Sequence, residues 1–279
     1  ILSHTGVDRS ALKIWAAQLN LSGASIYESE LTPADEDRVV ARNVNHLAGP
    51  ETFRFRVGSF DFQIDPIAFF QANFSLVAQF VDTIAAPHEG DILLDLYGGF
   101  GTYSFNAGTK FRKVYIVEAN PHSIRSAQDL AERSSIKNVE TSAISVEDFL
   151  KSMQKGPEAQ EITDIIVNPP RSGLSRHVIE ALSSPAFKRL ERLTYVSCDL
   201  STLQRDLREL LRAGHFTIEQ VLPFDMFPQT DHIENVVRLV RKNRTPDASS
   251  PSRSSHRVWP QAGLSRTKRS ARSWASPRK

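Results

Sequence analysis

The sequence predicts an α/β protein built on one mostly parallel sheet of seven strands. Between residues 87 and 240, short apolar segments alternate with segments whose apolar residues recur at helical spacing. This alternation is typical of parallel strands joined by helices that cover the sheet. A glycine-rich turn follows the first strand, and polar residues follow several others. Ligands bind outside the carboxyl ends of the strands in such sheets, so we expect the functional site at that edge.

Seven segments of this region have the length and apolar character of strands. They are residues 92–96, 114–117, 139–141, 164–167, 194–197, 216–221 and 234–240. The last two follow each other in the chain, and we expect them to pair antiparallel at one edge of the sheet. A helix before the first strand should carry Leu76, Phe80 and Ile84 on one face, because these residues are four positions apart.

The chain divides into a small partial α/β domain, a main domain and a C-terminal tail. Their predicted bounds are residues 1–60, 61–243 and 244–279. The first part has an apolar helical stripe between residues 11 and 19 and a strand at 53–57, where apolar and basic residues alternate. Arg54 and Arg56 share one face of this strand, where they are either solvated or in contact with phosphates.

The tail differs from the rest of the chain in charge. Residues 244–279 hold nine lysines and arginines and one acid, Asp247, whereas the other 243 residues carry a net charge of −6. Because the tail is rich in serine and has no hydrophobic periodicity, we predict that it is disordered. It is either a segment that steers RNA or an extension without a selected role. An RNA-binding surface elsewhere in the chain must therefore be local.

A single cysteine and the lack of long apolar runs limit the class of protein. Cys198 is the only cysteine, which excludes an internal disulfide and a zinc or iron–sulfur site built from several cysteines. No apolar run approaches the ~18 residues of a membrane span, and the first residues lack the shape of a secretory signal. We expect a soluble, cytoplasmic protein without a membrane partner, and a monomer. The start at Ile1 rather than methionine indicates a fragment or a processed piece.

The first candidate site is the turn Asp-Leu-Tyr-Gly-Gly-Phe-Gly at residues 95–101. Glycines let the backbone turn tightly and approach a ligand closely. Glu118 ends the next strand about twenty residues on, where a carboxylate suits a ribose diol. A nicotinamide or flavin site is an alternative, but the spacing lacks the dinucleotide pattern G-x-G-x-x-G. The turn and Glu118 resemble class I S-adenosylmethionine-dependent methyltransferases; the other alternative is a plain glycine turn.

The second candidate site is Asn168-Pro-Pro-Arg171, at the end of the fourth strand. A residue before proline is extended, which directs Asn168 outward from the strand end. In class I methyltransferases this position faces the methyl donor and the target base, and an N-P-P-Y form indicates methylation of an exocyclic amine. Arg171 replaces the aromatic residue that would stack on such a base, which argues against amine chemistry.

The third candidate site is Cys198, placed where the fifth strand ends and a leucine-rich helix begins. A helix N-terminus favours a thiolate, so this thiol is a candidate nucleophile. The structural alternative is a buried cysteine, since free cysteine is among the most buried residue types. Position alone does not separate the two.

Together, six motifs resemble the RNA uracil-5 methyltransferase family, the enzymes that make 5-methyluridine in tRNA and rRNA. In the family's order they are F-F-Q-A-N (69–73), D-L-Y-G-G-F-G-T (95–102), V-E-A-N-P (117–121), N-P-P-R-S-G-L (168–174), Y-V-S-C-D-L-S-T-L-Q-R-D (195–206) and D-M-F-P-Q-T-D-H-I-E (225–234). Residues 1–60 resemble part of the central domain that precedes the family's catalytic domain. The implied fold is the Rossmann-like class I methyltransferase fold.

The resemblance also implies residue roles. It makes Cys198 the nucleophile and Glu234 the general base. The site of the methyl donor, S-adenosyl-L-methionine, would be lined by Gln71, Tyr97, Thr102, Glu118 and Asn168. RNA, either tRNA or rRNA, is the implied substrate. Its phosphates have candidate contacts in Arg171, Arg176, Arg205 and Arg208.

The chemistry of uracil methylation needs these residue types, because C5 of uracil is a poor nucleophile. A thiolate that adds to C6 turns the ring into an enolate, and a base must later remove the C5 proton so that the thiol can leave. A free thiol has a pKa of ~8.5, so we expect the junction of strand and helix to activate Cys198. Without the motif around it, Glu234 would be an ordinary surface carboxylate.

The sequence departs from the family at three places. Gly98 stands where the family commonly has Cys, Asn168 where many members have Asp, and Asp199-Leu200 where Asn-Pro is usual. Without that proline, we expect Cys198 to be held less rigidly. Two other functions stay open: a non-catalytic RNA-binding module with a relict cofactor pocket, and an amine methyltransferase that would not need Cys198.

Overall fold

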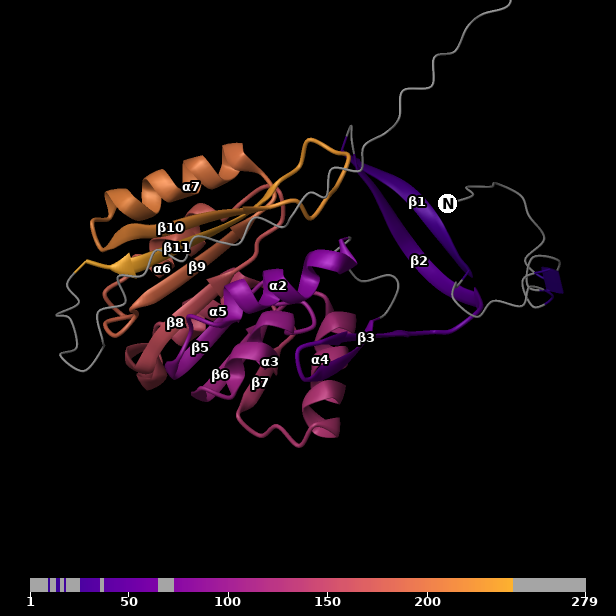
Figure 1. Ribbon diagram of the computed structural model, residues 1–279, viewed down its shortest axis with the longest axis horizontal. Coiled ribbons are helices and arrows are strands. Elements are labelled where there is room, and N and C mark those ends of the chain that lie inside the picture. The colour runs from indigo at the N-terminus through magenta and orange to yellow at the C-terminus, as the bar shows by residue number, and fades with distance from the viewer. Residues whose placement is uncertain are drawn as a thin grey trace, which may run out of the picture. The chain divides into compact units, whose positions relative to one another are not determined.

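The computed structural model describes residues 10, 14, 15, 18, 26–35, 38–64 and 73–242 (Figure 1). Three predictions fall wholly or largely outside these residues: the apolar stripe between residues 11 and 19, the cofactor residue Gln71 and the tail from residue 244 onward. Within the described ranges, no helix is both long and apolar enough to cross a membrane.

A seven-stranded, mostly parallel sheet carries the fold, as predicted. In sheet order its strands are β10 (Phe216–Phe224), β11 (Glu234–Arg241), β9 (Arg192–Ser197), β8 (Ile162–Val167), β5 (Gly90–Leu96), β6 (Phe111–Val117) and β7 (Val139–Ser142). Neighbouring strands are parallel except where β11 lies between β9 and β10 and runs antiparallel to both. The predicted pairing of the last two strands is confirmed, although only β10 lies at the edge.

Helices cover both faces of this sheet (Figure 1). One face packs against α2 (Phe74–Ala85), α3 (Thr102–Gly108) and α4 (Pro121–Arg133), and the other against α5 (Val146–Met153), the 3-10 helix η1 (Pro157–Glu161), α6 (Arg176–Leu182) and α7 (Leu200–Arg212). Alternate residues of β5 serve the two cores: Leu93 packs towards α2–α4, and Leu94 towards α5–α7. Burying each such side chain contributes about 1.5–3 kcal/mol. The stripe predicted on α2 is confirmed by Phe80 and Ile84, which are fully buried.

Two antiparallel hairpins precede α2. Their strands are β1 (Ile26–Asp35) with β2 (Arg38–Ala48), and β3 (Phe53–Val57) with β4 (Phe60–Ile64). Arg54 and Arg56 are both exposed on one face of β3, as predicted. Val57 and Phe62 are buried in the core formed by α2, α3 and α4. The domain boundary after residue 60 stays a prediction, and the β3–β4 hairpin spans it.

Candidate active site

The antiparallel strand β11 brings Glu234 to Cys198. Cys198 directly follows β9, and Glu234 is the first residue of β11. Asn235 pairs with Ser197, so Glu234 lies opposite Cys198 one step further along. Opposed residues of an antiparallel ladder have Cα atoms ~4.5–5.5 Å apart. The structure thus brings together the two predicted reacting side chains, which are far apart in the chain.

Glu234 is a buried carboxylate with an incomplete set of hydrogen bonds. It is 3% exposed, and its Oε2 has no hydrogen-bond partner in the described part of the chain. Burial raises the pKa of this carboxyl to about 7, and the positive charge of Arg171 opposes the rise. A carboxyl whose pKa lies near the working pH is suited to take up a proton during a reaction.

Cys198 is half-buried, and its thiol ionises less readily than a free one. Burial raises the pKa of Cys198 first and the charge of Glu234 raises it further, while Arg171 lowers it by its charge and by a hydrogen bond. The expectation that the start of α7 activates Cys198 is therefore wrong. The physical reason is that burial, and then the Glu234 carboxylate, disfavour the thiolate. The start of α7 is capped by Asp199, whose Oδ1 accepts the Thr202 N–H at 2.8 Å.

The turn after Cys198 is held by side-chain hydrogen bonds, although Leu200 replaces a proline. Ser197 Oγ accepts from the Asp199 N–H at 3.2 Å and donates to the Asp199 carbonyl at 3.0 Å. Thr202 Oγ1 donates to Asp199 Oδ1 at 3.1 Å. These bonds tie Ser197, Asp199 and Thr202 to one another. The loosening predicted from Leu200 has no counterpart in the hydrogen bonding of this turn.

The glycine-rich turn connects β5 to α3 and leaves space beside its backbone. Tyr97 and Gly101 have φ angles of 60° and 77°, in the left-handed region that favours glycine. A Cβ atom at Gly101 would lie 2.5 Å from Cδ1 of Ile116, so a larger residue does not fit there. At Gly99, no atom of the described chain lies within 4 Å of the place that a Cβ would take. A ligand can therefore approach the backbone at Gly99.

Glu118 and Asn168 face this turn from the neighbouring strands. The Glu118 carboxylate accepts the Gly99 N–H at 3.3 Å and the Asn120 N–H at 2.8 Å. The Asn168 side-chain amide donates to the Tyr103 hydroxyl at 3.3 Å, and its backbone N–H donates to the Leu96 carbonyl at 3.2 Å. Three of the five predicted cofactor residues, Tyr97, Glu118 and Asn168, directly follow β5, β6 and β8, and Thr102 is the first residue of α3, at the other end of the glycine-rich turn.

Asp95 is a second buried carboxylate at this edge, and in the sequence it was identified only as part of the glycine-rich turn. It is fully buried and accepts a hydrogen bond from Ser104. Its Oδ1 has no partner among the described residues. Burial raises the pKa of Asp95 to about 7. An acid inside the apolar run 92–96 was the signal that could have identified it.

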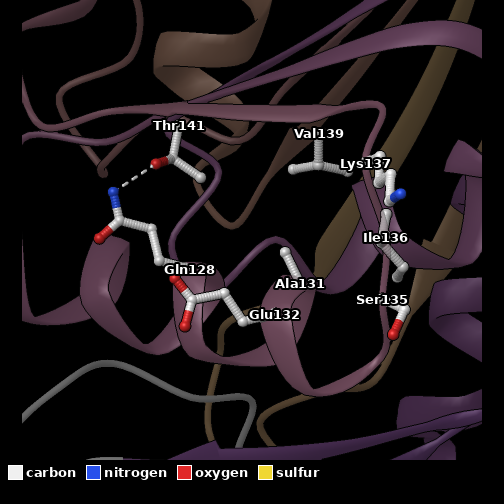
Figure 2. Close-up of a pocket in the computed structure, with 8 residues that line it drawn as sticks. All are labelled: Gln128, Ala131, Glu132, Ser135, Ile136, Lys137, Val139 and Thr141. Atoms are coloured by element: carbon white, nitrogen blue, oxygen red, sulfur yellow. Dashed lines mark hydrogen bonds between the residues drawn. The ribbon is translucent and has the colours of Figure 1, made fainter.

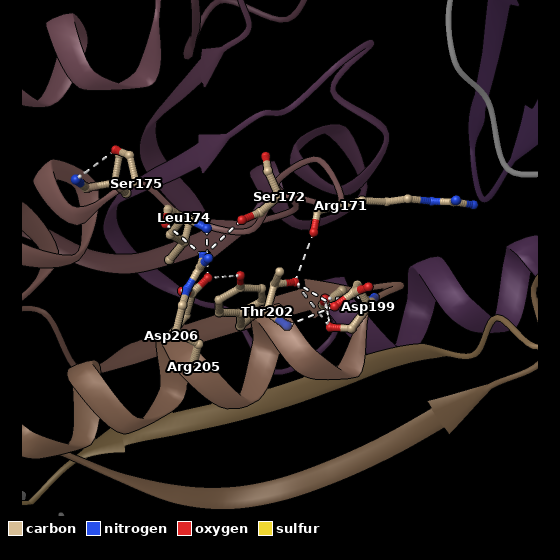
Figure 3. A network of polar contacts seen from close by, with 11 residues as sticks. Arg171, Ser172, Leu174, Ser175, Asp199, Thr202, Arg205 and Asp206 are labelled. Atoms are coloured by element: carbon tan, nitrogen blue, oxygen red, sulfur yellow. Dashed lines mark hydrogen bonds and ion pairs between the residues drawn. The ribbon is translucent and has the colours of Figure 1, made fainter. Parts of the chain in front are cut away.

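Asp206 on α7 is a third buried carboxylate, and sequence reasoning missed its role (Figure 3). Its Oδ2 accepts the Leu174 N–H and the Tyr195 hydroxyl, both at 2.7 Å. Its Oδ1 accepts Nε of Arg205 at 2.8 Å, so this arginine is engaged in the fold rather than free for a phosphate. The sequence spacing could have predicted that Asp206 is buried, because it follows Leu203 by three positions and therefore lies on the buried stripe of the helix.

A separate hollow of about 550 Å³ lies between α4 and β7 (Figure 2). It is lined by Gln128, Ala131, Glu132, Ser135, Ile136, Lys137, Val139 and Thr141. Gln128 Nε2 donates to Thr141 Oγ1 at 2.8 Å across one side of it. The hollow shares no residue with the predicted site, so we do not assign it to the chemistry at the strand ends.

Comparison with known proteins agrees with this geometry. The sequence profile of the tRNA (uracil-5-)-methyltransferase family matches residues 52–242. An RNA methyltransferase of Thermotoga maritima is 39% identical over 188 residues, which cover 66% of this chain and 40% of that protein. An RNA methyltransferase of a Nostoc species is 30% identical over 240 residues, which cover 84% of this chain and 49% of that protein. The chain therefore spans at most about half the length of these curated relatives.

Solved structures with similar folds are S-adenosylmethionine-dependent enzymes. The tRNA (uracil-54, C5)-methyltransferase of Pyrococcus abyssi, in complex with S-adenosyl-L-homocysteine, has a TM-score of 0.59 and 27% identity over 77% of this chain and 50% of its own. A putative SAM-dependent methyltransferase of Streptococcus mutans has a TM-score of 0.54 and 14% identity over 71% of this chain and 58% of its own, a likeness of fold alone. The predicted class I methyltransferase fold is confirmed.

Proposed function

Since the chain belongs to the tRNA (uracil-5-)-methyltransferase family, we propose that it transfers a methyl group from S-adenosyl-L-methionine to C5 of a uridine in tRNA or rRNA. Cys198 is the nucleophile of this reaction and Glu234 is the general base. The observation that carries the proposal is the position of the buried Glu234 carboxylate, one oxygen of which has no partner within the described residues, opposite Cys198, the only cysteine in the sequence. Both lie at the sheet edge that holds the glycine-rich turn.

The residues at the end of β5 fit S-adenosyl-L-methionine. The open space at Gly99 lets a ligand reach the backbone, and the Glu118 carboxylate stands beside it with acceptor capacity left for ribose hydroxyls. Tyr97, Thr102 and Asn168 complete the described part of the site, and Gln71 is the further predicted member. When bound, this cofactor supplies the electrophilic methyl group that C5 receives.

Cys198 makes C5 reactive by adding to the neighbouring carbon. The thiolate forms a bond to C6, and the C5–C6 double-bond electrons move into an enolate that extends to O4. After methylation, C5 carries both the methyl group and its original proton. Glu234 takes that proton, the double bond forms again, and the bond between sulfur and C6 breaks to return the thiolate.

Both side chains must be ionised when they act, which sets the direction of the pH dependence. Burial holds the pKa of Glu234 at about 7 and raises that of Cys198. Turnover therefore increases as the pH rises through 7. The buried position of Glu234 also keeps bulk water away from the proton that it removes.

The RNA substrate must present a uracil outside its stack, because neither side chain can reach a base inside a helix. Arg176 and Arg208 are exposed and remain phosphate-contact candidates, whereas Arg205 is held by Asp206. Arg176 forms an ion pair with Glu180 on the exposed face of α6 at 2.8 Å. Such an exposed pair contributes little to stability and can exchange its partner for a phosphate.

The test is direct detection of the product. Transcripts of tRNA and rRNA without modifications are incubated with the protein and S-adenosyl-L-methionine that carries an isotope-labelled methyl group. Digestion and mass spectrometry of the nucleosides should find the label in 5-methyluridine, and reactions without the protein serve as blanks. Label in a methylated adenosine, cytidine or guanosine, or in no nucleoside, would reject the proposal.

A further inference from the structure

Thr202, near the start of α7, binds two segments that flank the site. Its backbone N–H donates to Asp199 Oδ1 at 2.8 Å, and Asp199 directly follows Cys198. Its side-chain hydroxyl lies 3.0 Å from the carbonyl oxygen of Arg171, in the loop that follows β8 (Figure 3). One residue therefore links the turn that carries the thiol to the loop that begins at Asn168.

The Thr202 hydroxyl is shared between the loop and the turn. It carries a single proton, and three oxygens lie within reach: the Arg171 carbonyl at 3.0 Å, Asp199 Oδ1 at 3.1 Å and the Asp199 carbonyl at 3.4 Å. Asp199 keeps its bond from the Thr202 backbone N–H in any case. The Arg171 carbonyl has no other donor among the described residues. The loop therefore depends on this hydroxyl, whereas the turn does not.

Farther along the same face of α7, Arg205 and Asp206 hold the rest of the loop. A guanidinium nitrogen of Arg205 donates to the Ser172 carbonyl at 2.9 Å and to the Leu174 carbonyl at 3.3 Å. The buried Asp206 carboxylate accepts the Leu174 N–H at 2.7 Å. The contact therefore runs through the backbone of the loop, whose position it fixes.

The fit between loop and helix leaves no space for a side chain at Gly173. Its φ is 74°, in the left-handed region that favours glycine. A Cβ atom there would lie 2.5 Å from Asp206 Oδ2, 2.7 Å from a guanidinium nitrogen of Arg205 and 3.0 Å from Cβ of Thr202. The three residues of α7 that bind the loop therefore also enclose this glycine.

We propose that Thr202 is a positioning residue of the reaction, whose hydroxyl holds the loop after β8 at the separation from Cys198 that methyl transfer needs. This role rests on the proposed function, in which Asn168 lines the methyl-donor site and Cys198 adds to the base. The sulfur must reach C6 while the methyl group reaches the neighbouring C5, so the two segments have to keep a fixed separation. Reacting atoms stand ~3–3.5 Å apart, and a displacement of ~1 Å can lower a rate about 10²-fold.

The backbone bond to Thr202 leaves the Arg171 side chain for a separate task. This side chain is exposed and extends away from the network of α7 (Figure 3). It stays a candidate for the RNA phosphate contact that the sequence predicts. Thr202 acts on the carbonyl of Arg171 and not on its guanidinium.

Hydrogen exchange tests the fastening of the loop without any substrate. Thr202→Val removes the hydroxyl but keeps nearly the same shape and the backbone N–H that bonds to Asp199. Because one hydrogen bond to the loop is lost, we expect the amides of residues 171–174 to exchange about fivefold faster than in the wild type. The amides of the buried strand β5, which report global unfolding, should change by less.

Mass spectrometry of peptic fragments provides the exchange rates. Thr202→Ser, which keeps the hydroxyl, should restore slow exchange in the loop. Ser201→Ala, at an exposed hydroxyl on the same turn of α7, is the matched control and should exchange as the wild type does. Loop exchange in Thr202→Val at the wild-type rate would overturn the proposal.

Steady-state kinetics then tests the positioning, with an unmodified transcript that the wild-type protein methylates. Thr202→Val should lower kcat about tenfold, because the reacting groups are less well aligned. KM for S-adenosyl-L-methionine should stay within about threefold, since Asn168 is held separately by its backbone bond to the Leu96 carbonyl. A hydroxyl that only stabilises the fold would change the urea midpoint and leave kcat of the folded protein as it is.

Two further variants check that the position of the loop is what matters. Thr202→Ser should keep kcat within about twofold of wild type. Gly173→Ala displaces the loop from α7 without altering the helix, so it should lower kcat at least as much as Thr202→Val. If Gly173→Ala does not fold, the comparison of Thr202→Val with Thr202→Ser decides alone.

Failure of this role and failure of the proposed function give different results. An active wild type together with a wild-type kcat in Thr202→Val would overturn the positioning role while 5-methyluridine is still formed. A wild type that forms no 5-methyluridine would reject uridine methylation and with it the role of Thr202 in that reaction. Faster exchange in Thr202→Val would then show only that the hydroxyl fastens the loop.

Discussion

The two ends of the sheet differ in how completely their buried carboxylates are hydrogen-bonded. At the amino ends of β8 and β9, His88 and Asp164 are fully buried, and their side-chain polar atoms all have partners. At the opposite edge, Asp95 and Glu234 are as deeply buried, yet each keeps an oxygen without a hydrogen bond in the described residues. The chain therefore pairs both oxygens of Asp164 at one end, whereas Asp95 and Glu234 at the other end each have one oxygen without a partner among the described residues.

The structural end forms a closed network. His88 Nδ1 lies 2.8 Å from Asp164 Oδ1, and its Nε2 lies 2.8 Å from Thr194 Oγ1. Nε of Arg192 donates to the same Asp164 oxygen at 2.6 Å, which compensates the carboxylate charge. Burial lowers the pKa of His88, although Asp164 opposes this. The histidine is therefore neutral at pH 7 and serves to hold β8 and β9 together.

This difference in hydrogen bonding separates a buried carboxylate that stabilises the fold from two that are available for a reaction. Burial raises the pKa of Asp95 and of Glu234 to about 7, and groups with such perturbed pKa values cluster at functional sites. The closed network around Asp164 shows that this fold can pair a buried carboxylate fully. Four predictions test this contrast and are given in order of decreasing expected effect.

Cys198→Ala should abolish the formation of 5-methyluridine, because no other thiol is present to add to C6. Its affinity for S-adenosyl-L-methionine, measured by titration calorimetry, should stay within about twofold of wild type, since Cys198 does not belong to the turn at Gly99. Nucleoside mass spectrometry provides the activity measurement. Full turnover by this variant would disprove the covalent mechanism, and a wild-type protein that binds no methyl donor would favour a relict pocket.

Glu234→Gln should lower turnover about 10²–10⁴-fold, the usual contribution of a general base. Since Cys198 can still add and the proton can no longer leave, a covalent complex of protein and RNA should accumulate. The complex should appear as a band of reduced mobility on a denaturing gel. It should be absent from the double variant that carries both Glu234→Gln and Cys198→Ala. Glu180→Gln, at an exposed carboxylate of α6, is the matched control. Normal turnover by Glu234→Gln would place the base elsewhere.

Asp164→Asn should leave the chemistry unaffected and reduce the stability of the fold. It leaves Arg192 without its buried counter-charge and weakens the hydrogen bond that Asp164 makes with His88, and breaking a buried ion pair costs about 3–5 kcal/mol. The measurement is the midpoint of urea denaturation at pH 7. Asp231→Asn, at a carboxylate that is 95% exposed, is the control. A stability equal to wild type would remove the distinction between the two ends of the sheet.

Glu234→Gln should also be more stable than the wild type above pH 7, by about 1–3 kcal/mol. The folded carboxyl has a pKa of about 7 against an ordinary value of 4.5, so the folded state binds its proton more tightly than the unfolded state does. The wild type therefore loses stability as the pH rises from 4.5 through 7, and a neutral glutamine does not. Unfolding in urea at pH 4, 6 and 8 checks this. Equal stabilities at pH 8 would mean that Glu234 is better solvated than its burial indicates.

Much of the fold follows from local patterns in the sequence. The alternation of apolar strands with helical stripes predicts all seven strands, because burial on both faces demands continuous apolar runs such as 92–96. The glycine-rich turn predicts that a ligand can approach the backbone there. Its tight course depends on Gly101, which has a positive φ and no space for a Cβ atom. The sequence also predicts that Cys198 and Asn168 lie at strand ends, because each of them ends an apolar run.

Other features were decided only by tertiary structure. Periodicity does not say which strands pair, and the insertion of β11 between β9 and β10 is what sets Glu234 opposite Cys198. The pKa of Cys198 is raised by burial and by the charge of Glu234, which lies far from it in sequence. The position of Cys198 at the start of a helix therefore gave the wrong direction for this pKa. The contact between α7 and the loop after β8 likewise needs Asp206 and Leu174, which lie far apart in sequence, to meet. Periodicity is a short-range property of the chain, whereas electrostatic environment is set by whichever distant residues the fold packs together.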